Sequence, residues 1–173
     1  TRNREGKGGL LDVNMYNCAL MFQSTGIASY LSGGEFPAKT GSAAPYSAPN
    51  EAIPTKDGWI MIAAYHEDRW KALCLLIGQP ELIDHPEFAD SPRRVANRAK
   101  MVARLANTFC TKTTAEWQGL LEASDIIAAP IAAYDVVTAS PQVAHNNAIV
   151  TMKHPVAGDV RMPGFLLGDR DSA

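Results

Sequence analysis

"TKDGWIMIAAYHEDRWKALCLLIG", residues 55–78, decides the fold, because it holds a turn, a strand and a helix in direct succession. Residues 56–58, Lys-Asp-Gly, are typical of a tight turn, and the apolar run 59–65 predicts a strand with an antiparallel partner near Ala52-Ile53. The helix that follows ends at Gly78. Its apolar positions recur at helical spacing: Trp70, Leu73, Cys74 and Ile77. A hairpin packed on a helix therefore forms the centre of the predicted domain.

Four consecutive polar residues, His66, Glu67, Asp68 and Arg69, join this strand to the helix and are either a catalytic cluster or a helix start. Acidic side chains in a first helical turn complement the partial positive charge of its exposed N–H groups. A zinc site of the H-E-x-x-H type would need a second histidine where Trp70 stands. We interpret the four residues as a helix start.

Length and charge limit the classes of partner. The chain has 173 residues and a net charge of −2, which suits one domain with appendages. Because basic residues form no block, we expect no nucleic-acid partner, and no apolar run approaches the roughly 18 residues of a membrane span. The chain begins at Thr1 with no targeting signal, so we expect it to be part of a longer protein.

The cysteines Cys18, Cys74 and Cys110 are odd in number, far apart and set in apolar stretches. This pattern predicts reduced, buried thiols in a cytoplasmic protein, with no metal spacing.

The first third of the chain combines short elements with a long loop. Leu10–Val13 is a predicted strand that contains the lone carboxylate Asp12, and a helix over 14–32 ends at Gly33-Gly34. Residues 35–54 are rich in Pro, Ala, Ser and Gly and show no periodicity. Loops of about 20 residues are usually functional or disordered.

The remainder predicts helices and then a second hairpin. A helix begins at Ser91-Pro92, with a core face of Val95, Val102, Leu105 and Phe109. Its arginines Arg93, Arg94 and Arg98 would form a solvated face, or could approach a phosphate. Thr113–Glu116 is a capping box before a helix that carries Trp117, Leu120 and Leu121.

Residues 126–134 have a proline at their centre and predict an edge strand, two short helical turns follow, and a hairpin turns at 157–159. Short antiparallel strands with several helices make an α+β fold, without the βαβ alternation of a doubly wound domain.

The residues by themselves offer no convincing catalytic set. No G-x-S-x-G, G-x-G-x-x-G or Walker motif is present in the sequence. His85 and His154 each precede a proline, and His145 lies in a polar loop. The long loop is the most suggestive feature.

Five stretches in order resemble class III CoA-transferases, the CaiB/BaiF type, to which the α-methylacyl-CoA racemases are related. They are "REGKGGLLDVNMYNCAL" (4–20), "APYSAPNEAIPTKDGWIMIAAYHEDRWKALCLLIGQPEL" (44–82), "HPEFADSPRRVANRAKM" (85–101), "TTAEWQGLLEASDIIAAPI" (113–131) and "VAGDVRMPGFLL" (156–167). The family has a large and a small domain, and its chains interlock in pairs. The resemblance implies that residues 1–32 are a strand and linker helix of the large domain. It implies that 33–148 are the small domain and 149–173 a returning hairpin.

The resemblance also implies the chemistry. CoA would move between carboxylic acids through an aspartyl acyl intermediate, with acyl-CoA and an acid as substrates and no tightly bound cofactor or metal. The family's nucleophile lies upstream of this segment, so no residue here is assigned catalysis and we expect the chain alone to be inactive. The segment aligned with the family's glycine-rich active-site loop has one glycine and reads Gly41, Ser42, Ala43, Ala44, Pro45 and Tyr46.

Two alternatives stay open at this point. One is a fragment of an acyl-CoA racemase or epimerase. The other is a non-catalytic interaction module that self-associates through an apolar helix face of Leu20, Phe22 and Ile27. The family's interlocked pairing likewise implies a homo-oligomer formed through this linker helix.

Overall fold

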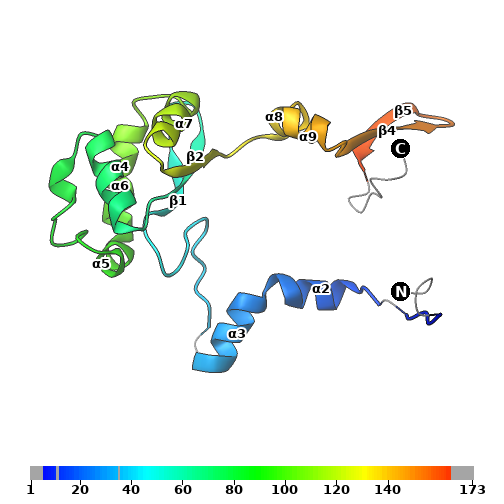
Figure 1. The fold of residues 1–173 in the computed structure, drawn as a ribbon, viewed down its shortest axis with the longest axis horizontal. Helices are drawn as coiled ribbons and strands as arrows, with labels where there is room; N and C mark the ends of the chain where they lie inside the picture. Colours follow the sequence, from blue (N-terminus) through cyan, green and yellow to red (C-terminus); the bar gives the residue numbers. More distant parts are fainter. Residues whose placement is uncertain (1–5, 11, 35, 165–173) are drawn as a thin grey trace. The chain divides into compact units, whose positions relative to one another are not determined.

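The structure is a computed structural model that describes residues 6–10, 12–34 and 36–164. It divides into two compact units, Thr1–Gly41 and Ser42–Ala173, and each is described here by itself. Figure 1 colours the first unit in blue and the second from cyan to orange. The division of the chain at 32 and 148 that the family resemblance implies stays a prediction.

The first unit holds two helices, α2 (Met15–Phe22) and α3 (Ser24–Gly33), so the single helix predicted over 14–32 is wrong. The break is at Gln23, whose backbone angles (φ −95°, ψ 9°) leave the helical region. Thr25, which is β-branched, and Gly26 follow the break. Both residue types have low helix propensity, which favours an interruption here.

The predicted end of this helical region is confirmed. Gly34 adopts a left-handed conformation with φ 75°, and its N–H donates to the carbonyl of Tyr30 at 2.7 Å. Glycine is the residue that takes this conformation without a steric penalty.

The strand predicted at Leu10–Val13 is absent from the residues described there, and Leu11 lies outside the described residues. Leu10 and Val13 are 97% and 71% exposed. No neighbouring strand pairs with this segment within the described part of the chain, and an extended segment without a ladder is not a strand. Asp12 is exposed and accepts a hydrogen bond from Asn14 Nδ2 at 3.4 Å.

A three-stranded antiparallel sheet organises the second unit, in the order β1 (Asn50–Pro54), β2 (Trp59–Ala63) and β3 (Ile127–Pro130). Ile53 pairs with Ile60, and Ile62 pairs with Ala128. The predicted hairpin and the predicted edge strand are therefore both confirmed. The proline at the end of β3 is tolerated because β3 lies at the edge of the sheet.

Helices pack against this sheet and build one core (Figure 1). They are α4 (Glu67–Leu76), the 3-10 turn η1 (Pro80–Leu82), α5 (Ser91–Ala96), α6 (Arg98–Phe109) and α7 (Thr114–Ala123). Helix α6 contacts β1, and α7 contacts β2 and β3. The core includes the fully buried side chains of Ile53, Ile60, Ile62, Trp70, Leu73 and Leu105.

Two aromatic rings lock α7 onto α6. Trp117 stacks on Phe109 with ring centroids 4.4 Å apart, and its indole N–H donates to the Phe109 carbonyl at 2.7 Å. The predicted capping box is confirmed, since the N–H of Thr113 donates to the Glu116 carboxylate at 2.8 Å and the Glu116 N–H donates back to Thr113 Oγ1 at 3.3 Å. Leu120 of this helix is 37% exposed, so the buried face consists of Trp117 and Leu121.

The helix predicted to run from Ser91 through Phe109 is divided at Asn97 into α5 and α6. Asp90, one residue before the predicted helix start at Ser91, is the N-cap and accepts the Arg93 N–H at 2.8 Å. The buried face of α6 is Met101, Leu105 and Phe109, while Val95 and Val102 are only partly buried.

The last described elements are two short helices and a hairpin, as predicted. These are α8 (Tyr134–Thr138), α9 (Pro141–His145), β4 (Ile149–His154) and β5 (Gly158–Pro163). The turn occupies 155–157, slightly earlier than predicted, because Gly158 already pairs with His154.

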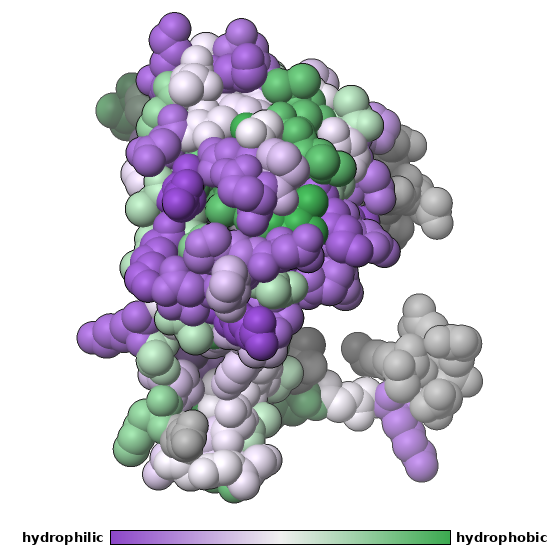
Figure 2. All heavy atoms as spheres, turned by 90° about the vertical axis from the view of Figure 1, so that its left-hand side faces the viewer, coloured by the Kyte–Doolittle hydropathy of each residue, from purple (hydrophilic) through white to green (hydrophobic). Residues whose placement is uncertain are grey.

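The exposed side chains of the second unit are mainly hydrophilic on the face that Figure 2 views. Smaller hydrophobic areas lie between them, over the helices of this unit. Cys74 is buried as predicted, but Cys18 is partly exposed and Cys110 is exposed, beyond the last buried turn of α6. Within the described residues, no helix is both long enough and apolar enough to span a membrane.

Leu105 and Leu75 offer a matched test of this core, because they are 0% and 62% exposed on helices of the same unit. We expect Leu105→Ala to lower the free energy of unfolding by about 2–5 kcal/mol, through lost burial and a residual cavity. Leu75→Ala should lower it by less than about 1 kcal/mol. Urea unfolding followed by tryptophan fluorescence measures both, and equal losses would contradict the assignment of the core.

Candidate functional site

The predicted site loop lies before β1 and has no helix or strand. Gly41 has φ 63°, a left-handed conformation that explains the single glycine of the loop. Ala43 and Ala44 are partly buried, whereas Pro45 and Tyr46 are exposed. The division between the two units falls between Gly41 and Ser42.

Hydrogen bonds tie the loop to the free edge of β1. The N–H of Ala44 donates to the Asn50 carbonyl at 2.9 Å, and the N–H of Ala52 donates to Ser42 Oγ at 3.2 Å. Within the loop, Asn50 Nδ2 donates to Ser47 Oγ at 3.2 Å. These contacts give the segment a defined backbone despite its low content of regular structure.

A guanidinium from α6 binds the same segment through two of its carbonyls. Arg98 Nη2 donates to the carbonyls of Ala44 and Ser47, at 2.7 and 2.9 Å. Arg98 Nη1 forms an ion pair with Glu51 of β1, whose side chain is only 3% exposed. The two bound carbonyls flank Pro45 and Tyr46.

A second guanidinium, that of Arg94, lies entirely inside the protein and is 0% exposed. It donates to three backbone carbonyls, those of Ala48 at 2.8 Å, Phe88 at 2.9 Å and Tyr65 at 3.2 Å. It therefore joins the end of the loop to two other segments of the unit. The expectation that Arg93, Arg94 and Arg98 form a solvated face is wrong for Arg94 and Arg98.

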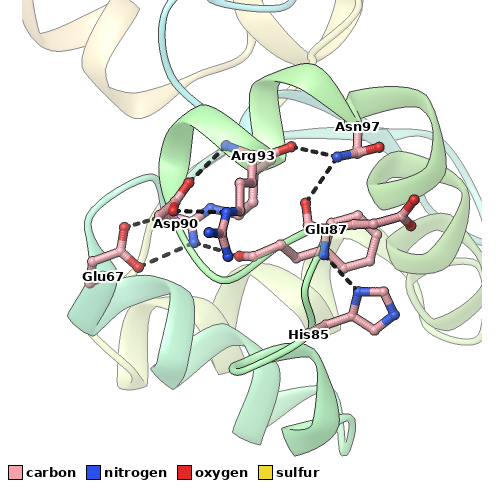
Figure 3. A network of polar contacts seen from close by, with 8 residues as sticks. Glu67, His85, Glu87, Asp90, Arg93 and Asn97 are labelled. Atoms are coloured by element: carbon pink, nitrogen blue, oxygen red, sulfur yellow. Dashed lines mark hydrogen bonds and ion pairs between the residues drawn. The ribbon is translucent and has the colours of Figure 1, made fainter.

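The charge of Arg94 is balanced by Glu67, which binds it through both carboxylate oxygens at 2.7 and 3.2 Å (Figure 3). The guanidinium also lies over the ring of Trp70, 4.9 Å from its centroid. A paired, fully hydrogen-bonded arginine of this kind satisfies the condition for burying a charge. Glu67 is therefore part of the structural network.

The neighbours of Glu67 also have structural contacts. His66 is the N-cap residue of α4, and Glu67 and Asp68 lie in its first turn. Arg69 Nε donates to the carbonyl of Asp125 at 2.9 Å. These contacts support our interpretation of residues 66–69 as a helix start.

A carboxylate in the β1–β2 turn caps α7 from a distance in the sequence. Asp57 accepts the N–H of Thr114 at 2.7 Å and its hydroxyl at 2.9 Å. These bonds lower the pKa of Asp57 below its ordinary 3.8. The pKa of Glu116 is lowered in the same way by the N–H and hydroxyl of Thr113.

One cysteine and two histidines among the candidate nucleophiles and bases are buried or hold structural hydrogen bonds. Burial raises the pKa of the Cys74 thiol to about 12, so the thiol is protonated at neutral pH. His85 Nδ1 accepts the Glu87 N–H at 3.2 Å (Figure 3), and His154 Nδ1 accepts two turn N–H groups. Among the described residues, no group of three or more His, Cys, Asp or Glu could hold a metal ion.

Two hollows lie in the first unit, and none of residues 42–46 lines them. One of about 450 Å³ is lined by residues between Asp12 and Phe22, and one of about 350 Å³ by residues between Tyr16 and Pro37. Both are apolar and open beside helices that bury no residue. The first hollow also has the polar side chains of Asp12, Asn14 and Asn17 in its lining. The loop remains the candidate site because the family resemblance predicts it.

The buried contacts of Arg94 and Arg98 were not predicted from the sequence, although the helical spacing of the apolar residues indicates them. Counting back from the buried Leu105 and Met101 in helical steps leads to Arg98 and Arg94, on the face that points to the core. Charged residues at core-facing positions predict buried partners, and Glu51 at an inward position of β1 is such a partner.

The cap formed by Asp57 predicts a pH dependence. Its folded pKa lies below the unfolded value, so its contribution to stability is complete above about pH 4 and is lost as the pH falls through the folded pKa. We expect Asp57→Asn to lower the thermal midpoint at neutral pH, and the difference from wild type to shrink below about pH 4. Asp84→Asn, which removes an exposed carboxylate outside any helix or strand, is the control. A difference for Asp57→Asn that stays constant into acid would contradict this role.

Comparison with known proteins identifies the family of this chain. The sequence model of CoA-transferase family III matches residues 1–170. Succinyl-CoA:glutarate CoA-transferase of Mus musculus is 33% identical over 163 residues, and acetyl-CoA:oxalate CoA-transferase of Acetobacter aceti is 31% identical over 165. Both alignments cover 94% of this chain but only 37% and 41% of the relatives. The chain thus spans about two fifths of the length of these curated relatives.

Solved structures agree. The crystal structure of Rv3272 from M. tuberculosis matches 95% of this chain and 42% of its own, with a TM-score of 0.75 and 27% identity. A CaiB/BaiF family protein from Brucella suis matches 95% of this chain and 47% of its own, with a TM-score of 0.74 and 26% identity. The α+β fold and the resemblance seen in the sequence are confirmed, and a small-domain portion fits the coverage. The chain belongs to CoA-transferase family III.

Proposed function

We propose that the protein to which this chain belongs moves CoA from an acyl-CoA to a free carboxylic acid, without a tightly bound cofactor. The observation that carries this proposal is the family match over residues 1–170. The names of the two curated relatives, which describe transfer of CoA to dicarboxylic acids, support transfer over racemisation.

The proposed chemistry is nucleophilic catalysis by an aspartate. Its carboxylate attacks the thioester carbonyl, the carbon–sulfur bond breaks, and CoA leaves as the thiolate. The thiolate then attacks the aspartyl carbonyl of this mixed anhydride, which releases the donor carboxylate and leaves an aspartyl-CoA thioester. The acceptor carboxylate attacks that thioester, and CoA leaves again as the thiolate. The thiolate finally attacks the acceptor carbonyl of the second anhydride, which forms the new acyl-CoA and frees the aspartate. The resemblance puts this aspartate upstream of residue 1, so we propose that the isolated chain performs no turnover.

We propose that this chain contributes the loop 41–46 as a wall of the acyl-CoA site. The short side chains of Ser42, Ala43 and Ala44 would let a ligand approach the backbone closely. The hydrogen bonds from β1 and Arg98 support a fixed wall over a mobile lid, because they hold both ends of the exposed Pro45–Tyr46 pair. A loop that is already ordered loses less entropy when a ligand binds.

Calorimetric titration of the purified chain with CoA and one short acyl-CoA tests this role. We expect binding at micromolar strength, with about tenfold weaker binding in Tyr46→Ala, which removes an exposed ring from the loop. Tyr134→Ala, at a tyrosine 90% exposed outside the loop, is the matched control and should bind like the wild type. Equal affinity of all three proteins would exclude the loop from the site, and turnover of acyl-CoA by the chain would contradict the upstream nucleophile.

We propose further that the chain self-associates through the helices of its first unit. Helices α2 and α3 bury none of their residues, and Met15, Phe22 and Leu31 are 89%, 89% and 76% exposed. Apolar surface of this extent marks an interaction site, and the family's interlocked pairs make a second copy of the chain the expected partner.

Light scattering should therefore give the mass of a dimer, because pairing would bury these apolar side chains. We expect Phe22→Ser to shift the protein toward monomer, because it puts a hydroxyl into the proposed interface. Val156→Ser, at a valine 90% exposed in the hairpin turn of the second unit, should leave the mass unchanged. A strictly monomeric wild-type chain at high concentration would refute this pairing.

A further inference from the structure

We propose that Arg98, coupled to Glu51, is a positioning residue that sets the backbone of residues 42–50. This inference rests on the proposed function, in which that loop faces the acyl-CoA. Arg98 contributes through the backbone of the loop, and no contact between Arg98 and a substrate is required.

The geometry places three acceptors around one guanidinium. The carbonyls of Ala44 and Ser47 share Nη2, and the Glu51 carboxylate takes Nη1. Because the two carbonyls flank Pro45 and Tyr46, the guanidinium fixes the distance across the exposed tip of the loop. The hydrogen bonds within residues 42–50, from Ala44 to Asn50 and from Asn50 to Ser47, do not involve these two carbonyls.

Arginine suits this task better than lysine. Its planar guanidinium offers donors in fixed directions, whereas a lysine ammonium is a single point charge on a flexible stem. Lysine at position 98 would reach the carboxylate or the carbonyls, but not all three with one rigid group.

The energetics of Glu51 point to positioning over stability. Its side chain is 3% exposed on the helix-covered face of β1, and its Oε1 atom has no hydrogen-bond partner among the described residues. Burial of an ion pair with an unsatisfied oxygen contributes little to stability and is often outperformed by an apolar pair. An apolar pair could not bind the two loop carbonyls.

Arg94 completes the arrangement at the far end of the segment. Its Nε donates to the carbonyl of Ala48 at 2.8 Å, and that residue is fully buried. Arg94 thus binds the segment 42–50 at Ala48, and Arg98 binds it at Ala44 and Ser47. Arg98 is the better target for a test, because Arg94 also joins two further segments and its removal would disturb the whole unit.

Four variants separate positioning from stability: Arg98→Gln, Glu51→Gln, the double variant and Arg98→Lys. Arg98→Gln leaves Glu51 charged and buried, so we expect the lowest thermal midpoint there, with recovery in the double variant, where neither charge remains. Arg104→Gln, at an exposed arginine of the same helix, is the control for loss of one positive charge.

Hydrogen exchange of the Ala44 amide, which donates to Asn50, reports the order of the loop. We expect at least about tenfold faster exchange in Arg98→Gln and in the double variant alike, with smaller changes at core amides such as Leu105. Arg98→Lys should recover part of the protection. If the double variant regains slow exchange together with its thermal midpoint, or if Arg98→Gln leaves Ala44 unchanged, the inference is overturned.

CoA titration of the same proteins distinguishes this inference from the proposed function. If the wild-type chain binds CoA, Arg98→Gln and the double variant should bind about tenfold more weakly, and equal affinity overturns the inference. If the wild-type chain binds no CoA, the proposed role of the loop fails. The exchange series then decides by itself whether Arg98 sets the loop.

Discussion

The buried guanidinium of Arg94 is the contact on which the arrangement of the second unit depends. It binds the carbonyls of Ala48, Phe88 and Tyr65, which belong to three segments far apart in the sequence, and its charge is met by Glu67. These segments are irregular, so their carbonyls have no ladder or helix to satisfy them. One rigid group with several donors supplies those bonds from the inside.

This constraint explains why a loop without regular structure can still have a defined backbone. Arg94 holds its end at Ala48, and Arg98 holds the carbonyls of Ala44 and Ser47. The two arginines order this loop but add little to the overall stability, because the hydrogen bonds and ion pairs of each guanidinium mainly offset the hydration energy that its charge loses on burial. The proposed wall of the site is therefore held in place before a ligand arrives, in contrast to a glycine-rich lid.

Much of the fold is visible in the sequence because it depends on local rules. The β1–β2 hairpin follows from a turn next to an apolar run, and the capping box at Thr113 and Glu116 satisfies N–H groups three residues apart. The edge position of β3 follows from Pro130, which cannot donate to a further strand. The family follows from five motifs in order.

The sequence by itself determined most of the helices and strands and their order, although it predicted a strand at Leu10–Val13 that is absent from the described residues there. The choice of the candidate loop also came from the sequence. Only the tertiary structure decided what holds that loop. An arginine on a helix is usually solvated, and the burial of Arg94 and Arg98 depends on carbonyls more than 40 residues away in the chain. The breaks at Gln23 and Asn97 are likewise small local deviations within helical periodicity. Periodicity reports which face of a helix is apolar, whereas the partners of a buried charge are set by segments that meet only in the folded protein.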